Sequence, residues 1–473
     1  MSEIIQQKPE HIDETKIPLK RVIGAVTAIL MVSGNMIGTG IFKKIVPMAQ
    51  TGLHEPWILL AWAVAGIIVT FGAFTYAGLS RLTTESGGAY EYLRVSLGGF
   101  IAFLSGWGLF IIIGSGSIAA IAFIFSQSVN ALIHIPNPLH NWQTISIAHS
   151  IYPFDSFGIK IFAAGTIILL TWFNVKGVKN SSFLNNVVTT AKILGVLFLI
   201  LAGIILSSPA SINEEVFPSN TILSHSSFFT VFLGAMLSAF WAYDGFTNVT
   251  SIAGEIKNPK RNIPIAIITA VTLVMVLYVL INYAFIKAMG IHQLAALGDN
   301  KIAATEVAGK ILGNKGKMLI SVLIMLSSFG TLNIIILFYS RVYFRMAQAN
   351  VFFKSASKVH PVYRTPYNAL WYSMIWCCIL TFSGSFDVLT NMVIFTDFAF
   401  YMLNSIGLIK LKRKKIITGK IPGYPWAPIL FILFTTVFLV GILVSNPAQS
   451  LAGTALILTG VPFYYFFKRK KSG

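Results

Sequence analysis

The sequence predicts an all-α polytopic membrane protein, and three observations support that fold class. Of the 473 residues, 55% are hydrophobic and only 11% are charged, whereas soluble domains carry about 25% charged residues. The mean hydropathy is +0.75. Apolar runs of about 20 residues, each long enough to cross a bilayer as a helix, recur from end to end. The composition excludes a secreted disulfide scaffold and a disordered chain, so the expected surroundings are the lipid bilayer.

Twelve apolar runs predict twelve transmembrane helices. They lie at residues 21–50, 56–80, 95–131, 157–175, 185–207, 228–256, 263–288, 317–348, 368–386, 388–410, 424–445 and 450–467. Because twelve is even, both termini lie on the same side of the membrane. A polar tail (1–20) precedes the first span, and a basic tail (468–473) follows the last.

The basic residues are distributed unequally over the loops, and this distribution orients the chain. Basic runs at 412–415 and 468–471 lie on the side of the termini, whereas the opposite side holds only six lysines: Lys160, Lys287, Lys301, Lys310, Lys315 and Lys317. Cytoplasmic loops collect Lys and Arg, so we predict a cell (cytoplasmic) membrane protein with both termini cytoplasmic. This topology accounts for the net charge of +19, and no nucleic-acid partner is expected.

Residue patterns of enzymes and metal sites are not recognisable in the sequence. Cys377 and Cys378 are neighbours in one apolar run, and they suit neither a disulfide framework nor metal-ligand spacing. The intramembrane ionisable residues form no nucleophile–base pair. We therefore expect no enzyme, no catalytic residue, no metal and no cofactor.

Two of the predicted spans contain a stretch that favours a broken helix. Span one carries three glycines within Gly34–Gly40, and each glycine lowers helix stability by about 1 kcal/mol relative to alanine. Span six carries Trp241-Ala242-Tyr243-Asp244-Gly245, with a carboxylate at membrane depth. The breaks occupy corresponding places if residues 21–207 (spans one to five) and 228–410 (spans six to ten) are two repeats. Since five is odd, the second repeat is inverted, and this pattern is typical of transporters.

The backbone of these breaks suggests a ligand. Amides freed after Gly38-Thr39-Gly40 would receive an anion such as a carboxylate, and carbonyls freed around Trp241–Asp244 would receive an ammonium group. A site with both ends matches the zwitterionic head group of an α-amino acid. The alternative is that the glycines only allow close helix packing.

Several motifs in this order resemble the amino acid permeases of the APC superfamily, and in particular their L-type amino acid transporter (LAT) branch. The matching segments are Ile37–Phe42 (Ile-Gly-Thr-Gly-Ile-Phe), Trp241–Gly245 followed by Glu255–Pro259, Leu332-Asn333, Ser340–Val342, Val359–Pro361 and Arg364–Pro366. The resemblance covers residues 20–471. It implies a LeuT/APC-type five-plus-five inverted repeat with two added helices at 424–467, small helices within 291–317, and alternating access.

The resemblance also implies which residues bind an amino acid substrate. They come from spans one, six and eight: Met36, Ile37, Gly38, Thr39, Gly40, Ile41, Trp241, Ala242, Tyr243, Asp244 and Asn333. Trp241 is expected to cover the bound side chain, or else simply to pack. The loop at 132–156 lacks the cysteine with which animal relatives bond a glycoprotein partner, so no disulfide-linked heavy chain and no obligate partner are expected.

Lys192 is the ionisable residue with the strongest functional implication. It lies inside span five, where a charge costs a few kcal/mol; the alternative is that it snorkels to the nearby helix end. In the resembled family a lysine at this place occupies what sodium-coupled relatives use as a cation site. This implies sodium-independent transport, with Lys192 bracing span one against span eight through Ser327 or Ser328.

Two membrane-embedded carboxylates leave alternatives open. Asp244 could pair with a cationic substrate side chain, or it could cap the second half of span six. Asp397 could carry a proton, or it could pair with a polar group of a neighbouring helix. Lys43 and Lys44 could face the outer vestibule, or they could snorkel.

The function expected from these features is sodium-independent exchange (antiport) of small neutral L-amino acids. A proton-coupled symporter or exchanger of basic amino acids or polyamines is the alternative raised by Asp244 and Asp397. A membrane amino acid sensor without flux is the alternative of a different class.

Overall fold

The structure is a computed structural model that describes residues 19–130, 132–143, 145, 153–206, 228–297, 301–383, 386–445 and 447–469. Most of each predicted terminal tail therefore lies outside the described residues. Within those ranges every regular element is a helix, and the one isolated β-bridge joins Ile23 and Ile256. The all-α prediction is confirmed.

The helices of the first half follow the predicted spans closely, with one addition. Span one is divided into α1, α2 and α3, and span three is one continuous rod made of α6, a π-helical turn η1 and α7. A separate amphipathic helix, α5, precedes that rod. The bounds are α1 Ala25–Met36, α2 Gly40–Lys43, α3 Ile45–Gln50, α4 Glu55–Leu79, α5 Gly88–Ser96, α6 Gly99–Gly108, η1 Leu109–Ile113, α7 Gly114–Asn130, η2 His140–Trp142, α8 Phe157–Val175 and α9 Val178–Ile205.

In the second half, span six is divided into α10 and η3, and small helices occupy the predicted segment between spans seven and eight. α13 bends at Gly313, whose φ of +65° interrupts the helix. The bounds are α10 Phe228–Tyr243, η3 Asn248–Glu255, α11 Pro259–Met289, α12 Ile291–Ala295, α13 Ala303–Gln348, η4 Lys354–Ser357, α14 Tyr367–Thr381, α15 Phe386–Arg413, α16 Trp426–Ser445, α17 Pro447–Leu458 and α18 Gly460–Arg469.

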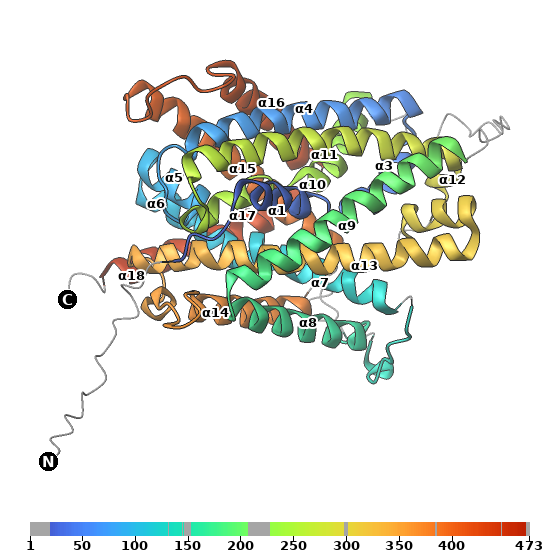
Figure 1. Ribbon diagram of the computed structural model, residues 1–473, viewed down its shortest axis with the longest axis horizontal. Helices are drawn as coiled ribbons and strands as arrows, with labels where there is room; N and C mark the ends of the chain where they lie inside the picture. The colour runs from blue at the N-terminus through green and yellow to red at the C-terminus, as the bar shows by residue number, and fades with distance from the viewer. Residues whose placement is uncertain are drawn as a thin grey trace, which may run out of the picture.

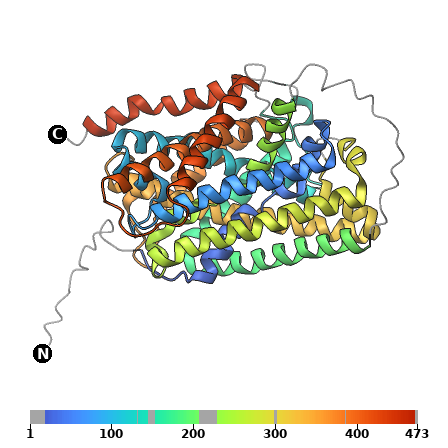
Figure 2. The ribbon, with the colours of Figure 1, turned by 90° about the horizontal axis from the view of Figure 1, so that it is seen from above.

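Eleven stretches of the described chain are helical, long and apolar enough to cross a membrane. The predicted ninth span corresponds to α14, which has 15 residues and packs between α7, α8 and α13. The helices lie side by side, and the described ends of the chain lie at the same end of the bundle (Figures 1 and 2). The protein is therefore a multi-pass membrane protein. The inverted-repeat relation between its halves stays a prediction.

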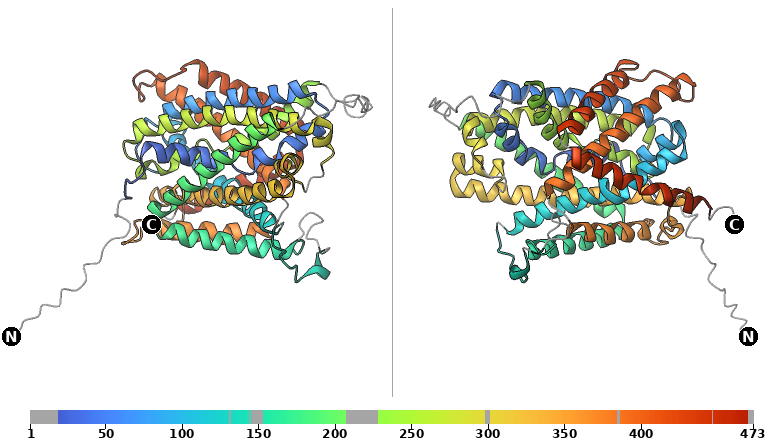
Figure 3. Two further views of the ribbon diagram at one scale, coloured as in Figure 1. Left: turned by 45° about the vertical axis from the view of Figure 1, so that its right-hand side comes forward. Right: turned by 180° about the vertical axis from the view of Figure 1, so that it is seen from behind.

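The helix α1 lies in the interior of the bundle. This helix packs against α9, α11, α13 and η3, and the views from two sides agree that other helices surround it (Figure 3). Seven of its residues from Ala28 to Met36 are buried, including the polar Ser33 and Asn35. A central helix with buried polar groups must direct them to neighbouring helices or to a cavity, because lipid offers no hydrogen bonds.

The end of the bundle where α1 begins, which we term the N-terminal face, is closed by backbone pairing and by ion pairs. The amides of Val22 and Ile23 donate to the carbonyl of Glu255, at 2.9 Å and 3.0 Å. The Glu255 carboxylate pairs with Arg341 of α13 at 2.7 Å, and both side chains are buried. The start of α1, the end of η3 and α13 are thus held together at this face.

A second ionic cluster at the N-terminal face surrounds Glu91 of α5. Arg94 Nε donates to Glu91 at 2.9 Å and Arg345 Nε donates to it at 3.3 Å, and Arg345 also pairs with Glu85. Burial alone would raise the pKa of Glu91. The hydrogen bonds from Arg94 and Arg345 outweigh burial, so this pKa lies below its ordinary value of 4.5.

This lowered pKa predicts a pH-dependent loss of stability. A carboxyl whose pKa is depressed by folding stabilises the protein above its ordinary pKa, and that contribution disappears as pH falls through the folded pKa. Lowering pH from about 6 to about 3.5 should therefore reduce the melting temperature of the wild-type protein more than that of Glu91→Gln. The measurement is thermal unfolding in detergent at several pH values. Equal slopes for both proteins would contradict the prediction.

Candidate functional site

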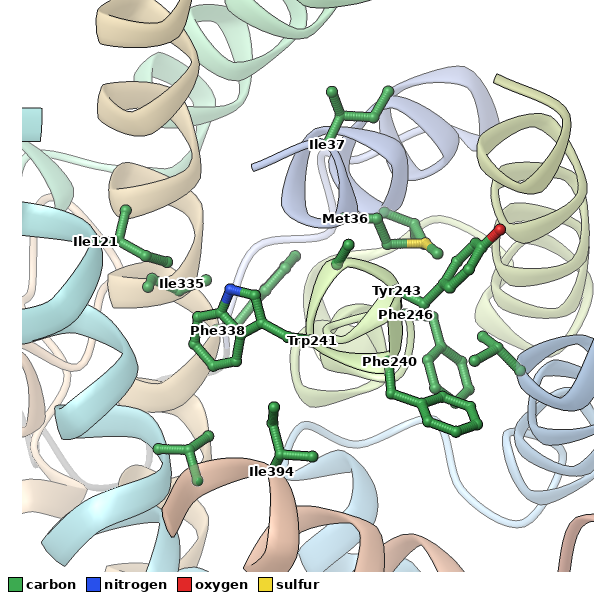
Figure 4. Packing of buried hydrophobic residues seen from close by; sticks show 14 of the residues in the cluster. Met36, Ile37, Ile121, Phe240, Trp241, Tyr243, Phe246, Ile335, Phe338 and Ile394 are labelled. Atoms are coloured by element: carbon green, nitrogen blue, oxygen red, sulfur yellow. The ribbon is translucent and has the colours of Figure 1, made fainter. Parts of the chain in front are cut away.

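The two predicted helix breaks face each other in the middle of the bundle. Residues 37–39 separate α1 from α2, and residues 244–247 separate α10 from η3. Gly245 has a φ of +92°, which favours glycine. Asn35 Nδ2 donates to the Gly245 carbonyl at 2.8 Å. Figure 4 shows Met36 of α1 beside the end of α10 that carries Trp241 and Tyr243. Both predicted breaks are confirmed, and they form one site.

Close approach of the two broken segments depends on Gly40. A Cβ at this position would lie 2.9 Å from the Ala242 Cα and 3.2 Å from the Trp241 ring. Backbone atoms cannot move aside as a flexible side chain can, so any larger residue at position 40 would separate α2 from α10. The glycine is therefore required at this contact and is not only a weak point in the helix.

Several carbonyls freed by the breaks are bound by side chains from neighbouring helices. The Tyr278 hydroxyl of α11 lies 2.6 Å from the Met36 carbonyl and 3.0 Å from the Ala242 carbonyl, so it links the two broken segments. Ser327 of α13 donates to the Ile37 carbonyl at 3.1 Å.

The amides at the start of α2, unlike these carbonyls, have no hydrogen-bond partner in the described backbone. The first amides of a helix lack intrahelical partners, and the backbone hydrogen bonds found in the described chain include none from the amides of Thr39 or Gly40. They remain available to an anion.

A cavity lies between the broken segments, α7 and α13. It leaves about 40 Å³ for the centres of water-sized spheres. Seven of the predicted substrate-binding residues line it: Met36, Gly38, Thr39, Gly40, Trp241, Ala242 and Asp244. Eight further residues complete the lining, namely Asn35, Ser117, Ile121, Gly245, Asn248, Thr331, Ile335 and Tyr339. We term this the central cavity.

Four predicted substrate-binding residues do not line the central cavity. The Ile37 side chain points away from Trp241 (Figure 4), Ile41 is fully buried, and the Tyr243 hydroxyl donates to the Trp62 carbonyl at 3.1 Å. Asn333 is wrongly placed by the prediction. Its amide donates to Ser181 at 2.9 Å and accepts from Asn174 at 2.9 Å, so it joins α13 to α8 and α9.

Lys192 of α9 braces α1 against α13, although not through the predicted serines. Its ammonium donates to the Gly34 carbonyl at 2.8 Å and to the Thr331 hydroxyl at 2.7 Å, and the side chain is buried. The lysine therefore does not snorkel to the helix end. Ser327 instead bonds Ile37, as described above, and Ser328 donates to Ile324 within its own helix at 2.9 Å. The partner on α13 is Thr331.

Asp244 does not cap the second half of span six. η3 begins at Asn248 after Thr247, and no side chain caps it. The Asp244 carboxylate instead accepts a hydrogen bond of 2.7 Å from the Tyr401 hydroxyl of α15, while it lines the central cavity. The N-cap interpretation is wrong, and the carboxylate is directed to the ligand space and α15.

Lys43 of α2 lines a different, wider cavity, whose other walls come from α7, α8 and α13. Lys301 and Lys317 line the same cavity, which leaves about 310 Å³ for the centres of water-sized spheres. This position agrees with the expectation that Lys43 faces a vestibule on the side opposite the N-terminal face.

Comparison with known proteins agrees with this architecture. The amino acid permease family matches residues 23–467. A serine/threonine exchanger of Bacillus subtilis (strain 168) is 28% identical over 462 residues, which covers 96% of this chain and 98% of the relative. The human large neutral amino acids transporter small subunit 2 is 30% identical over 454 residues, covering 95% and 81%. The mouse b(0,+)-type amino acid transporter 1 is 28% identical over 473 residues, covering 99% and 92%. The chain belongs to the amino acid permease family.

Proposed function

We propose that this permease exchanges small neutral L-amino acids across the cell membrane without sodium, by alternating access at the central cavity, with its N-terminal face in the cytoplasm. The serine/threonine exchanger and the other relatives support an amino acid as the ligand. The free amides at the start of α2 are suited to the substrate carboxylate, and the carbonyl end of α10 is suited to its ammonium group.

The observation that carries the sodium-independent mode is the position of Lys192. Its ammonium lies between a backbone carbonyl of α1 and a hydroxyl of α13. Unwound backbone carbonyls and neighbouring hydroxyls are the oxygen ligands that transporters of this kind use for a coupling ion. Because the Lys192 side chain occupies these ligands, a sodium ion is not needed to hold α1 against α13.

The lining supports a small substrate side chain. Trp241, Ile121 and Ile335 narrow the central cavity, and in Figure 4 the indole of Trp241 lies towards the isoleucines of α7 and α13. The remaining volume is room for only a few water molecules. A short side chain such as that of serine requires less rearrangement of this wall than a large one.

The test is uptake of labelled serine into proteoliposomes that contain the purified chain alone, in sodium-free buffer at equal pH. Vesicles preloaded with unlabelled serine are compared with empty vesicles, and Gly40→Val serves as the inactive control because its side chain would meet the backbone of Ala242. We expect uptake only into preloaded vesicles. Equal uptake into empty vesicles would contradict exchange. Binding without counterflow would indicate a sensor, and a requirement for added sodium would contradict the role assigned to Lys192.

A further inference from the structure

A second cavity adjoins the central cavity. Asn248 and Tyr339 line both. The wall of the second cavity comes from α4, α5, α6, α13, η3 and α15, and it includes Asp397 and Tyr401 of α15. Neither cavity has a lysine or arginine in its described lining. The second cavity therefore places another membrane-embedded carboxylate beside the substrate site without an adjacent basic side chain.

Tyr401 connects the carboxylates of the two cavities. Asp397 and Tyr401 are four residues apart on α15, so they share one helix face. The Tyr401 hydroxyl donates to Asp244 at 2.7 Å, and Asp397 lines the second cavity together with this tyrosine. A phenol has one proton. Since Tyr401 gives that proton to Asp244, Asp397 can hydrogen-bond the same oxygen only as a protonated carboxylic acid.

An unpartnered hydroxyl also points to a polar occupant of this cavity. Tyr76 of α4 lines the second cavity and is fully buried, and its hydroxyl makes no hydrogen bond of standard geometry within the described chain, although the Asn404 side chain of α15 lies near it. Its ring packs edge-on against that of Tyr401, with centroids 5.8 Å apart. A buried hydroxyl without a well-formed hydrogen bond costs up to about 1–3 kcal/mol, so a small polar species that can donate or accept a proton would be stabilised here.

The other titratable groups around Asp397 are tyrosines and one carboxylate. α4 contributes Tyr76, α5 contributes Tyr90, α13 contributes Tyr339 and the end of α10 contributes Asp244. The sequences of α7, α16 and α17, which also pack against α15, contain no titratable side chain. The nearest ionic groups of α5 and α13, Glu91 and Arg341, have their own partners at the N-terminal face. No described basic side chain therefore neutralises the pair of carboxylates.

We propose that Asp244, Tyr401 and Asp397 form a proton-binding site, and that one bound proton accompanies the substrate-loaded carrier. The proposal rests on the exchange function proposed above. The proton on Asp397 passes to the Tyr401 oxygen while the Tyr401 proton passes to Asp244, so Tyr401 is restored and one proton has moved from the second cavity to the central cavity. With both carboxylates ionised, mutual repulsion in a low-dielectric interior would oppose closure of the loaded site.

Exchange would then depend on pH although it carries no net proton. Each direction of an exchange cycle moves one loaded carrier and one proton, so the proton movements cancel. The rate depends on the fraction of carrier that is protonated. Once pH rises above the range in which the site holds its proton, that fraction falls about tenfold per pH unit.

The experiment is serine–serine exchange in proteoliposomes, with identical pH inside and outside, at several values between about 5.5 and about 9. For the wild-type chain we expect a decline towards about tenfold per pH unit at the alkaline end. Asp397→Asn should be independent of pH over this range, because asparagine can donate to Tyr401 but cannot lose the proton. Tyr401→Phe removes the hydroxyl that connects the two carboxylates, so the alkaline decline should move to a different pH even if Asp397→Asn fails to fold. Asp155→Asn, an exposed loop position, is the matched control and should retain the wild-type profile.

The outcomes separate this inference from the function on which it rests. A wild-type rate that is constant over the whole range, or an unchanged alkaline decline in both Asp397→Asn and Tyr401→Phe, would overturn the proton site while leaving exchange established. Absence of serine exchange by the wild-type chain at every pH would overturn both proposals. Loss of the decline in Asp397→Asn, its displacement in Tyr401→Phe and its retention in Asp155→Asn would support the site.

Discussion

Replacing Lys192 with alanine is expected to reduce serine exchange about a hundredfold. The substitution removes two hydrogen bonds of a buried ammonium, at 2.8 Å to the Gly34 carbonyl and 2.7 Å to the Thr331 hydroxyl. Leaving buried polar groups without their charged partner costs about 1–3 kcal/mol, and about 2.7 kcal/mol corresponds to a hundredfold change in rate. The Gly34 carbonyl adjoins the break in α1, so the loss acts directly on the position of the broken segment.

The measurement is the initial exchange rate into preloaded proteoliposomes, normalised to correctly inserted protein. Lys160→Ala is the matched control, because Lys160 is a second buried lysine that lies on α8 and lines none of the cavities described. Thr331→Val should give a smaller loss, since the ammonium still binds the Gly34 carbonyl at 2.8 Å and only the longer hydrogen bond of 3.1 Å from the Thr331 hydroxyl to that carbonyl is lost with it. A Lys192→Ala protein that folds and exchanges at the wild-type rate would refute the bracing role. Restoration of its activity by added sodium would show that the ammonium replaces a cation.

The membrane spans and the two helix breaks could be predicted from the sequence because each has a local cause. Twenty apolar residues in a row have few alternatives to a membrane helix. Three glycines in Gly34–Gly40 weaken one helix, and a carboxylate next to Gly245 at membrane depth requires a cavity or a partner. Seven of the residues that the resemblance assigns to substrate binding line the central cavity, and their binding of substrate stays a prediction. The short α14 shows the limit, since 15 residues satisfy no simple length rule.

The partners supplied by other helices could not be predicted, because they depend on how helices rotate and cross. Thr331 and Asn333 illustrate this point. Residues two apart on an α-helix point about 200° apart around its axis, so when Thr331 faces α1, Asn333 faces α8 and α9. Span eight does line the central cavity, but through Thr331 and not through the predicted Asn333. Lys192 needs an oxygen partner on the side of span eight that faces α1, and this requirement would have favoured Thr331 over Asn333.

Tyr278 and Tyr401 were missed for a related reason. A tyrosine in an apolar span has no sequence pattern that separates packing from hydrogen bonding. Their roles arise only because α11 and α15 cross the broken segments, which brings the Tyr278 hydroxyl to Met36 and Ala242 and the Tyr401 hydroxyl to Asp244. A polar side chain within a span is a usable signal only when the group that it must satisfy is already known.

Replacing Glu255 with glutamine is expected to destabilise the N-terminal face by about 3 kcal/mol, because removing the charge of one partner leaves the other ion buried without compensation. Arg341 is fully buried and donates to Glu255 through Nε at 2.7 Å and through a terminal nitrogen at 3.5 Å. Its remaining hydrogen bonds go to the Ser340 hydroxyl and the Leu337 carbonyl, which are uncharged. Denaturant unfolding in mixed micelles measures the loss. Glu306→Gln, which alters the more exposed pair with Lys317, should change stability by less than about 1 kcal/mol.

A double variant separates the charge from the shape of this pair. In Glu255→Gln with Arg341→Met, no buried ion remains, so stability should recover by more than half relative to Glu255→Gln alone. Recovery of stability need not restore exchange, because Glu255 and Arg341 join η3 to α13 at the face where Val22 and Ile23 bind the Glu255 carbonyl. A double variant that is stable but exchanges serine slowly would therefore show that the ion pair helps to close this face during the transport cycle. A double variant no more stable than Glu255→Gln would show that the loss does not come from the unpaired guanidinium.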